Sequence, residues 1–446
     1  MEMKYSYEEV VEIIQNKRRF GNLTGYEISK IVLEKLGNPQ DGLPIIHIAG
    51  TNGKGSVSAF LCNILIEAGL KTGMFTSPHL VEFGERIRIN GELIPREDVK
   101  RLGNLLLDMD FGVHPTMFDY CMAMALLYFK EQQCDVIILE TGLGGKYDST
   151  NAVGVPVVSV ITKIGYDHMA ILGNTLPEIA AEKAGIIKKG THVICESQDE
   201  EIENIFIETA RNAGAASMKL INWDELQIEP MTEQGEQSFS AYGYEHLTMK
   251  MLGLHQYENA AAAILAGEAF LENWKALVCV DKGQNAESPQ NRCDRFEKDE
   301  IVNAVRKGIA KTVWKGRMEI LSTEPFFMID GAHNAHGVMA LYKSLMALYP
   351  GEKFHFIMGV MADKDYEDMI EVLLPLAIDF TTVTVGYSRS LEAKELAECI
   401  SAKGVRAESK ESLEEALADL KKERESKTIA FGSLYFIGEI EEKNGI

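Results

Sequence analysis

The chain has 446 residues, 46% of them apolar, and a formal net charge of −22. This length exceeds what a single hydrophobic core usually supports, so we expect two domains. The acidic charge argues against broad contact with nucleic acid or with an anionic membrane surface, because both partners require a basic protein face.

Cysteine usage and the N-terminal stretch predict the compartment. The seven cysteines are scattered without a CxxC pair, and the acidic N-terminus has no apolar core of a secretion signal. No apolar run approaches the length of a membrane span. We therefore expect a cytoplasmic protein with reduced thiols.

Short apolar runs alternate with helical patterns through the first two hundred residues. Helices are predicted at 26–36 and 117–130, and strands at 45–49, 72–76, 136–140, 157–164 and 191–195. Such alternation predicts an α/β fold with a mostly parallel sheet covered on both faces. Ligands bind these sheets at the carboxyl ends of the strands, where the notable polar residues of this chain lie.

The first predicted strand is followed by a glycine-rich turn and an apolar helix. The turn consists of Gly50, Thr51, Asn52, Gly53, Lys54, Gly55 and Ser56. Backbone N–H groups at a helix start suit nucleotide phosphates, with Lys54 as counter-charge and Ser56 near a magnesium ion. The strict G-x-x-x-x-G-K-[ST] pattern is not met, because the first two glycines are too close and Gly55 takes the hydroxyl position. We interpret the turn as a phosphate-binding loop.

Three polar side chains stand at or just after other predicted strands: Ser77, Glu140 and His168. Carboxylate and other hard oxygen ligands suit magnesium. Taken singly, each residue is also compatible with an ordinary polar loop position. Together, on neighbouring strand ends, they predict a metal site.

Lys183 is expected on a short, mostly apolar helix that begins near Thr175. Loss of solvation there favours the neutral amine, which can react with carbon dioxide to give a carbamate, a metal ligand. The residues by themselves favour a simpler interpretation, an ion pair with Glu182 or Glu178.

The middle of the chain is less regular. Residues 197–248 are polar and predict a small strand-rich excursion, followed by an alanine-rich helix at 255–270. Residues 281–300 have almost no apolar side chain, so we expect a mobile surface loop there.

A hinge is predicted near Lys315 and Gly316. It separates a phosphate-loop domain at 1–316 from a smaller α/β domain at 317–446, whose strands are predicted at 326–329, 354–358, 381–385 and 428–431. In this second domain Arg317 has the charge to clamp a phosphate across a cleft, Asp330 could hold ribose or base groups, and His333 could meet a phosphate. Each is equally compatible with a structural role.

Taken together, these residues resemble the folylpolyglutamate synthase/dihydrofolate synthase family, within the Mur-ligase-type amide ligases. The matching stretches run in family order from residue 47 almost to the C-terminus. They are HIAGTNGKGSV (47–57), TSPHLVEFGERIRINGE (76–92), ETGLGGKYDSTN (140–151), DHMAILGNTLPEIAAEKAGIIK (167–188), NAAAA (259–263), KGRME (315–319), DGAHN (330–334), DKD (363–365) and GSLYFIGE (432–439).

The resemblance implies that ATP phosphorylates a carboxylate and that the amine of L-glutamate attacks the acyl phosphate. The acid is the glutamyl tail of a reduced folate, and whether dihydropteroate is also accepted stays open. ATP and Mg²⁺ are the implied cofactors. We expect a monomer that acts on small molecules, without a nucleic-acid or membrane partner.

Carried over by position, the resemblance assigns a role to each candidate residue. The turn at 50–56 cradles the phosphates of ATP, and Lys183 is carbamylated, which reverses the simpler interpretation. The implied metal ligands are Ser77, Glu140, His168 and Lys183, the last three forming the catalytic centre. The nucleotide site is completed across the cleft by Asn259, Arg317, Asp330 and His333.

The chain departs from the family pattern in three places. Lys315 replaces a proline before the hinge, Phe118-Asp119-Tyr120 stands where Phe-Glu-Phe is common near the pterin pocket, and Lys146-Tyr147 replaces Arg-Leu.

Two other functions stay open. One is a muramyl-peptide ligase, which usually carries a nucleotide-sugar domain before the phosphate loop. The other is a nucleotide-binding module without turnover.

Overall fold

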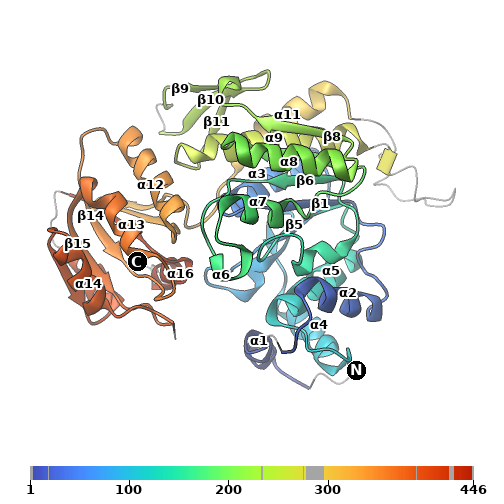
Figure 1. Cartoon of the computed structure of the whole chain (residues 1–446), viewed down its shortest axis with the longest axis horizontal. Coiled ribbons are helices and arrows are strands. Elements are labelled where there is room, and N and C mark those ends of the chain that lie inside the picture. Colours follow the sequence, from blue (N-terminus) through green and yellow to red (C-terminus); the bar gives the residue numbers. More distant parts are fainter. Residues whose placement is uncertain are drawn as a thin grey trace.

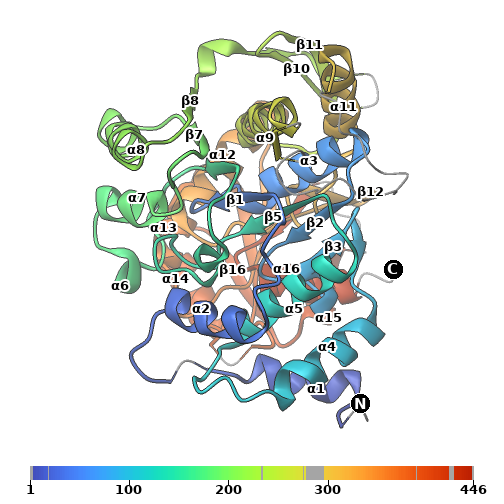
Figure 2. The ribbon, with the colours of Figure 1, turned by 90° about the vertical axis from the view of Figure 1, so that its right-hand side faces the viewer.

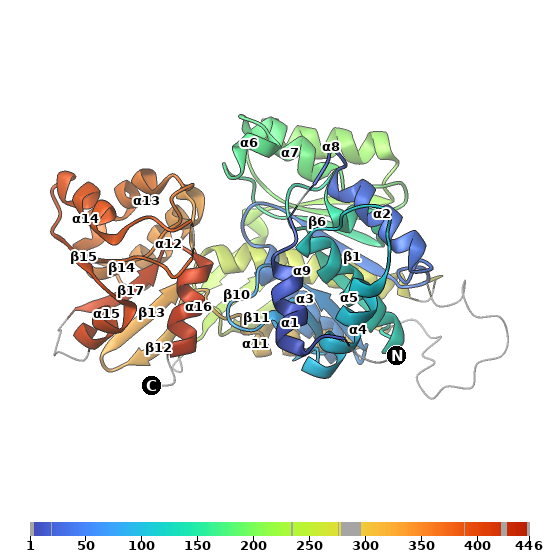
Figure 3. The same ribbon diagram turned by 90° about the horizontal axis from the view of Figure 1, so that it is seen from below.

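The computed structural model describes residues 4–18, 20–232, 235–274, 276–277, 296–387, 389–420 and 426–443. These residues form a larger N-terminal α/β unit and a smaller C-terminal α/β unit, which lie beside each other in Figures 1 and 3. Each unit is built on its own sheet, which confirms the predicted fold class. In the described part of the chain, no helix is long and apolar enough to cross a bilayer.

The N-terminal sheet has eight strands in the order β4-β3-β2-β5-β1-β6-β7-β8. Its strands are β1 (Ile45–Ala49), β2 (Thr72–Phe75), β3 (Ile87–Ile89), β4 (Glu92–Leu93), β5 (Val136–Glu140), β6 (Val158–Ile161), β7 (His192–Glu196) and β8 (Ser217–Ile221). All neighbours from β2 to β8 pair in parallel, whereas β3 is antiparallel to both of its neighbours, β2 and β4. The carboxyl ends of the parallel strands therefore point to one edge of the sheet.

Helices cover both faces of this sheet. They are α1 (Tyr7–Gln15), α2 (Gly25–Lys35), α3 (Lys54–Glu67), α4 (Arg96–Asp108), α5 (Met117–Glu131), α6 (Met169–Leu172), α7 (Leu176–Ala184), α8 (Glu200–Ala213), α9 (His255–Glu272) and α11 (Lys298–Lys311). Figure 2 shows α3, α9 and α11 above the sheet, and α1, α2, α4 and α5 below it. Buried apolar side chains fill both interfaces, so the central strands β1, β2, β5 and β6 are covered on both faces.

The stretch 197–248 is more regular than its sequence predicts. It contains α8 and β8, which extend the main sheet, before the three-stranded antiparallel sheet of β9 (Leu226–Glu229), β10 (Gln237–Ala241) and β11 (Tyr244–Met249). A strand-rich excursion is present, but only after residue 221. The sequence pattern does not reveal this helix, because α8 buries only Ile202, Phe206 and Ala210 and its first turn is acidic.

The C-terminal sheet has six strands in the order β12-β13-β17-β14-β15-β16. Its elements are β12 (Glu319–Thr323), β13 (Phe326–Asp330), α12 (Ala335–Leu348), β14 (Phe354–Met358), α13 (Tyr366–Leu373), β15 (Ala377–Val383), α14 (Ala393–Ala402), β16 (Ala407–Lys410), α15 (Leu413–Leu420), β17 (Lys427–Phe431) and α16 (Leu434–Lys443). Only β12 is antiparallel to its neighbour. One buried core joins the sheet to α12, α13 and α14, and another joins it to α15 and α16.

The predicted mobile loop at 281–300 is only partly open to comparison. Residues 281–295 lie outside the described residues. Its last five residues are ordered, contrary to the prediction: Phe296 is buried against Trp274, and Glu297 and Glu300 form a capping box at the start of α11. One aromatic anchor and a helix cap are enough to fix this end of the segment.

Candidate active site

A cavity of about 750 Å³ is lined by residues of both units. Every residue predicted from the sequence to bind nucleotide or metal borders it. The carboxyl ends of β1, β2, β5 and β6 supply the N-terminal wall, and the turn after β13 supplies much of the C-terminal wall. The cavity therefore brings together residues that are far apart in the sequence.

The glycine-rich turn leads from β1 into α3 as the sequence predicts. Gly53 is the N-cap of α3 in a left-handed conformation (φ 93°), and no side chain caps this helix. A Cβ atom at this position would lie 2.4 Å from Asn259 Oδ1, so only glycine fits. The N–H groups of the first turn of α3 are thus directed toward the cavity without a capping side chain, as anion binding requires.

Lys54 is folded back over its own turn. Its Nζ donates to the carbonyls of Gly50 (3.2 Å) and Thr51 (3.3 Å) and lies 3.9 Å from Glu140 Oε1. Ser56 is buried, and its hydroxyl accepts a 3.4 Å hydrogen bond from Gln256 at the start of α9. This bond joins α9 to the turn, and within α9 Gln256 also accepts from Asn259 Nδ2 at 2.9 Å.

Glu140 and Ser77 come together at the ends of β5 and β2. The Glu140 carboxylate is buried, and its Oε2 accepts a 3.2 Å hydrogen bond from the backbone N–H of Ser77. Burial raises the pKa of Glu140, against the lowering effect of Lys54. A buried carboxylate beside a serine and facing a cavity fits the chemistry of a magnesium ligand. No cluster of three or more His, Cys, Asp or Glu residues suited to a metal occurs within the described ranges.

Lys183 is buried near the end of α7, a helix that begins with the expected capping box of Thr175 and Glu178. Its Nζ donates to the carbonyl of Gly50 at 2.8 Å. Burial, and then the charge of Lys54, lower the pKa of Lys183 to about 7. In the part of the chain that the structure describes, no carboxylate lies within 4.0 Å of this amine. An ion pair with a neighbouring glutamate is therefore wrong.

The two glutamates proposed for that ion pair have other partners. Glu178 accepts hydrogen bonds from the backbone N–H groups of Asn174 and Thr175, and Glu182 accepts one from Tyr147. The Lys183 amine thus borders the cavity with its pKa near neutrality and without a counter-charge, a setting in which the neutral form is well populated.

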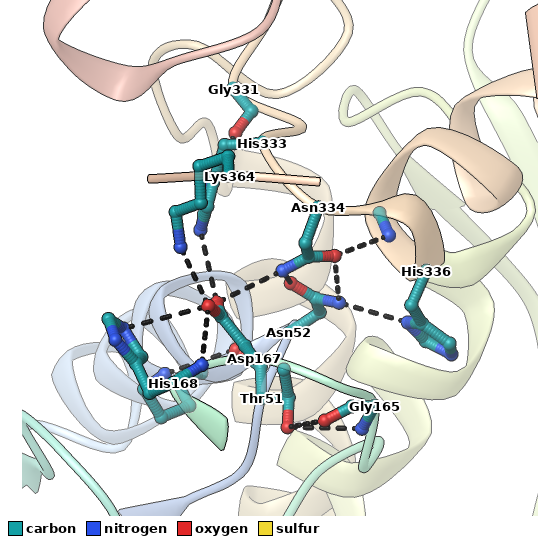
Figure 4. Close-up of polar contacts among 12 residues, drawn as sticks. Thr51, Asn52, Gly165, Asp167, His168, Gly331, His333, Asn334, His336 and Lys364 are labelled. Carbon is teal, nitrogen blue, oxygen red and sulfur yellow. Dashed lines mark hydrogen bonds and ion pairs between the residues drawn. The ribbon is translucent and has the colours of Figure 1, made fainter. Parts of the chain in front are cut away.

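His168 adjoins Asp167 (Figure 4). His168 has a left-handed backbone (φ 52°) and begins the short helix α6, with its N–H donating to Asp167 Oδ1 at 2.9 Å. The structure brings Ser77, Glu140 and Lys54 into contact, and it places His168 on the wall of the same cavity.

Asp167 connects the two units and was not predicted from the sequence. Its carboxylate binds Lys364 Nζ at 2.6 Å and Asn334 Nδ2 at 3.2 Å, and lies 3.7 Å from His333 Nε2 (Figure 4). Burial alone would raise the pKa of Asp167, but the hydrogen bond to His333 and the charges of His168 and Lys364 hold it well below its usual range. The Asp-His pair and the Asp-Lys-Asp motif at 363–365 were visible in the sequence, but nothing in either showed that they meet.

The phosphate-binding turn itself also contacts the C-terminal unit. Asn52 and Asn334 exchange two 3.2 Å hydrogen bonds between their side-chain amides, and Asn52 lies 2.9 Å from His336 Nδ1 (Figure 4). On the inner side, the hydroxyl of Thr51 donates to the Gly165 carbonyl at 3.1 Å. The turn is therefore held from both units.

The remaining predicted residues of the C-terminal unit surround the turn after β13. Asp330 is buried and accepts backbone hydrogen bonds from Met318 and Ala332, both at 2.9 Å. Burial raises the pKa of Asp330, and Arg317 opposes that rise. Arg317 borders the cavity and donates weakly to the Gly316 carbonyl at 3.4 Å. Asp330 thus links the residue after Arg317 to the turn after β13.

Phe118, at the start of α5, borders the cavity and packs directly on Gly142, where a Cβ atom would lie 2.7 Å from the ring. Asp119, at the position of the expected glutamate, is completely buried and accepts hydrogen bonds from Ser29 (2.7 Å) and Ser149 (2.6 Å). This departure from the family pattern is therefore structural, since Asp119 binds neighbouring segments rather than the cavity.

Comparisons with known proteins agree along the whole chain. The Mur ligase middle domain matches residues 48–267, and the Mur ligase glutamate ligase domain matches residues 316–432. Dihydrofolate synthase/folylpolyglutamate synthase of Bacillus subtilis is 35% identical, over 98% of this chain and 99% of that protein.

Solved structures show the same fold. Folylpolyglutamate synthase of Mycobacterium tuberculosis complexed with ADP has a TM-score of 0.83 at 25% identity, covering 99% of this chain and 98% of the other. E. coli FolC in complex with DHPP and ADP has a TM-score of 0.80 at 26% identity, also covering 99% of this chain and 98% of the other.

Proposed function

The chain belongs to the folylpolyglutamate synthase/dihydrofolate synthase family of Mur ligases, and from this membership and the cavity we propose how its residues perform the reaction. It is an ATP-dependent ligase that adds L-glutamate to a folate through an acyl phosphate. We propose dihydropteroate as a second acid substrate, because the cavity of about 750 Å³, which Phe118 borders, has room for the pterin of either acid.

The phosphate-binding turn is proposed to hold ATP. The uncapped first turn of α3 would receive the phosphates, and Lys54 would leave the carbonyls of Gly50 and Thr51 to meet them. Asn259 would close the nucleotide site from α9, where its side chain already lies against Gly53. These assignments rest on the uncapped N–H groups at the start of α3 and on the ammonium group of Lys54.

Mg²⁺ would be held by Ser77, Glu140, His168 and a carbamylated Lys183. The fit rests on the buried carboxylate of Glu140 and on a lysine whose amine is neutral enough to take up carbon dioxide. Magnesium would neutralise charge on the phosphoryl oxygens during transfer. Glu140 and Lys183 sit on a strand end and a helix that are buried in the N-terminal unit, so their positions are fixed before any substrate arrives.

The C-terminal wall is proposed to complete the site across the cavity. Arg317 would bind phosphate, Asp330 would hold the turn that carries it and meet the ribose, and His333 would face the reacting groups. We place the domain boundary after residue 316, so that the first domain holds the phosphate loop and the second, from 317, supplies this wall. Phosphoryl transfer depends on such positioned charge more than on covalent chemistry.

Two further parts of the proposal concern the protein as a whole. We propose that it acts as a monomer, because one chain supplies both walls of the cavity. We propose a cytoplasmic location, supported by the five described cysteines, all of which are free thiols and four of which are buried.

The alternatives explain less. The described residues ahead of β1 form α1 and α2, which pack into the core of the N-terminal unit and not into a sugar-binding domain. A nucleotide-binding module without turnover would not require a buried carboxylate and a lysine with a pKa near 7 on the same cavity wall. The observation that carries the proposal is that a single cavity unites the phosphate loop, Glu140, Lys183 and Arg317.

The test is ADP release with tetrahydrofolate and with dihydropteroate in parallel, each with and without L-glutamate. We expect release that requires both the acid and glutamate, with product one glutamate heavier by mass spectrometry. Release that is independent of glutamate, or binding of ATP without any release, would overturn the ligase assignment. Activity with tetrahydrofolate alone would remove only the dihydropteroate part.

A further inference from the structure

Arg86 is a buried cation that has no carboxylate partner. It ends the 3-10 helix η1 (Phe83–Arg86) just before β3 and is 4% exposed. Across the described residues, no carboxylate lies within 4.0 Å of its guanidinium, and its one side-chain hydrogen bond runs from Nε to His79 Nδ1 at 2.8 Å. Burying a charge without a counter-charge is costly, so this position suits a bound anion.

The adjacent acid does not neutralise Arg86. The carboxylate of Glu85 accepts three backbone hydrogen bonds, from Leu80, Val81 and Glu82 at 2.9 to 3.0 Å. Glu85 therefore folds the segment after His79 into a tight loop and leaves the guanidinium next to it free. The same loop docks on the C-terminal unit, where the Leu80 carbonyl lies so close to Gly438 of α16 that a Cβ atom there would be 2.2 Å away.

The guanidinium borders the active-site cavity at the end where the phosphates are proposed to lie. Lys54, Arg317 and Arg86 all line this cavity, and the charge of each lowers the pKa of Glu140. Lys54 belongs to the phosphate-binding turn, and Arg317 belongs to the opposite wall. Arg86 comes from a third element, the β2–β3 connection.

We propose that Arg86 is a catalytic residue that binds the reacting carboxylate of the acid substrate and holds it against the terminal phosphate of ATP. This proposal rests on the proposed function. The acid and ATP are both anions, so bringing them together requires a cation that is not already used by the phosphates. A guanidinium with both Nη groups available matches a carboxylate in geometry as well as in charge.

In the first step, one carboxylate oxygen forms a bond to the γ-phosphorus, and the bond from that phosphorus to the β,γ-bridging oxygen breaks. ADP leaves with the electron pair of that bond. The second carboxylate oxygen, which becomes the carbonyl oxygen of the acyl phosphate, stays on Arg86. In the second step that oxygen takes up negative charge as the glutamate amine attacks the carbonyl carbon. It then returns to a carbonyl as the C–O bond to phosphate breaks, and the departing phosphate takes up the proton that the amine loses.

His79 is a positioning residue in this scheme. Its Nδ1 accepts the only intramolecular hydrogen bond that the described residues offer to the Arg86 side chain. This bond occupies Nε and leaves both Nη groups without a hydrogen-bond partner among the described residues. An asparagine at position 79 keeps an acceptor near the place of Nδ1, whereas a leucine removes it.

The test compares two probes, tetrahydrofolate and its analogue with the reacting carboxylate replaced by an amide, by calorimetry in the presence of a non-hydrolysable ATP analogue. Losing a charge-assisted pair weakens binding by about 10- to 100-fold, so the wild type should prefer the acid by this factor. Arg86→Gln should bring the preference below about threefold with nucleotide affinity unchanged. Arg96→Gln, an exposed arginine nearby, serves as the matched control and should keep the full preference.

A full acid preference in Arg86→Gln would overturn the proposal. If that variant does not fold, Arg86→Lys replaces it; a loss of at least about fivefold in preference supports the paired contact, and an unchanged preference contradicts it. His79→Asn should retain most of the preference and His79→Leu should lose it; equal behaviour of the two would remove the positioning role. Wild-type protein that binds neither probe contradicts the proposed function itself, which separates the two failures.

Discussion

The two walls of the cavity are built differently. On the N-terminal wall, Glu140 and Lys183 are almost completely buried and supported by the sheet: Glu140 ends β5, and Lys183 lies on α7 with its amine on the carbonyl of Gly50. On the C-terminal wall, Lys364 and His333 have side-chain exposures of 15% and 26%, and both reach across to Asp167.

This difference in burial indicates a separate role for each wall. Buried groups on strand ends cannot move without disturbing a core, so their geometry and altered pKa values are permanent. Side chains joined across an interface by a few polar bonds can separate and rejoin as substrates enter and leave. We therefore propose that the N-terminal wall fixes the chemistry and that the C-terminal wall supplies closure.

The largest expected effect is at Lys183. Lys183→Ala should lower kcat by at least about 1000-fold, and added short carboxylates should restore part of the rate by filling the place of the carbamate. Lys183→Arg should remain inactive despite its charge, because a guanidinium does not form the carbamate. Rates are measured by glutamate-dependent ADP release, with the melting temperature as the folding control. An active arginine variant would show that charge alone matters.

Replacement of Glu140 should have the next largest effect. Glu140→Gln keeps the shape of the side chain but removes the charge, so we expect about a 100-fold lower kcat and a higher magnesium requirement. Glu97→Gln, an exposed acid on α4, is the control and should change neither quantity. His168→Ala should also raise the magnesium requirement. If either variant instead melts early at normal turnover, that residue is structural.

Asp167 tests the closure assigned to the C-terminal wall. Asp167→Asn removes the charge that Lys364 and His333 share, so we expect about 10-fold lower kcat/KM and a larger radius of gyration in solution scattering with ATP bound. Glu371→Gln breaks an ion pair with Lys403 inside the C-terminal unit and is the matched control. Unchanged scattering and activity in Asp167→Asn would remove the closure role.

Stability should depend on pH through Lys183. Its pKa is lowered from 10.5 to about 7 in the folded protein, so between these values the unfolded chain binds more protons than the folded one. The cost of burying this lysine is complete below pH 7 and is relieved as pH rises toward 10.5. In buffer free of carbon dioxide, the melting temperature of the wild type relative to Lys183→Met should therefore rise between pH 7 and pH 9. A difference that does not vary with pH would contradict the low pKa.

The smallest effect is expected at Lys315, which replaces the proline that the family usually has before the hinge. Lys315 is 63% exposed and pairs with Glu441 of α16 at 2.7 Å. The lysine end of this pair is open to solvent, but the Glu441 side chain is only 8% exposed, so Lys315→Ala should lower the free energy of unfolding by about 1 to 2 kcal/mol and change activity by less than about twofold. A larger loss of activity would make the hinge part of the closure machinery.

The N-terminal wall is also the part that could be predicted from the sequence. The strands predicted at 45–49 and 136–140 coincide with β1 and β5, because continuous apolar runs mark strands buried on both faces. The burial of Lys183 followed from the apolar residues around it in α7. In each case the signal lies within a dozen neighbouring residues.

The C-terminal closure could not be predicted in this way. Asp167 and Lys364 are 197 residues apart, and no local pattern shows that two polar loops meet in space. For the same reason the Asn52–Asn334 hydrogen bond could not be predicted. The helix α8 was not predicted because its first turn is acidic and it buries only three side chains. Contacts between domains are set by tertiary packing, which composition and periodicity do not record.

In the proposed reaction, the terminal phosphoryl group of ATP is transferred to the reacting carboxylate, and the amine of glutamate then displaces phosphate from the acyl phosphate. Its most direct test uses tetrahydrofolate labelled with ¹⁸O in that carboxylate, unlabelled ATP and L-glutamate, with mass spectrometry of the released phosphate. An acyl phosphate intermediate leaves one labelled oxygen on the phosphate for each amide bond formed, and this is the result that the account predicts. Phosphate without the label, at normal rates of amide formation, would contradict it.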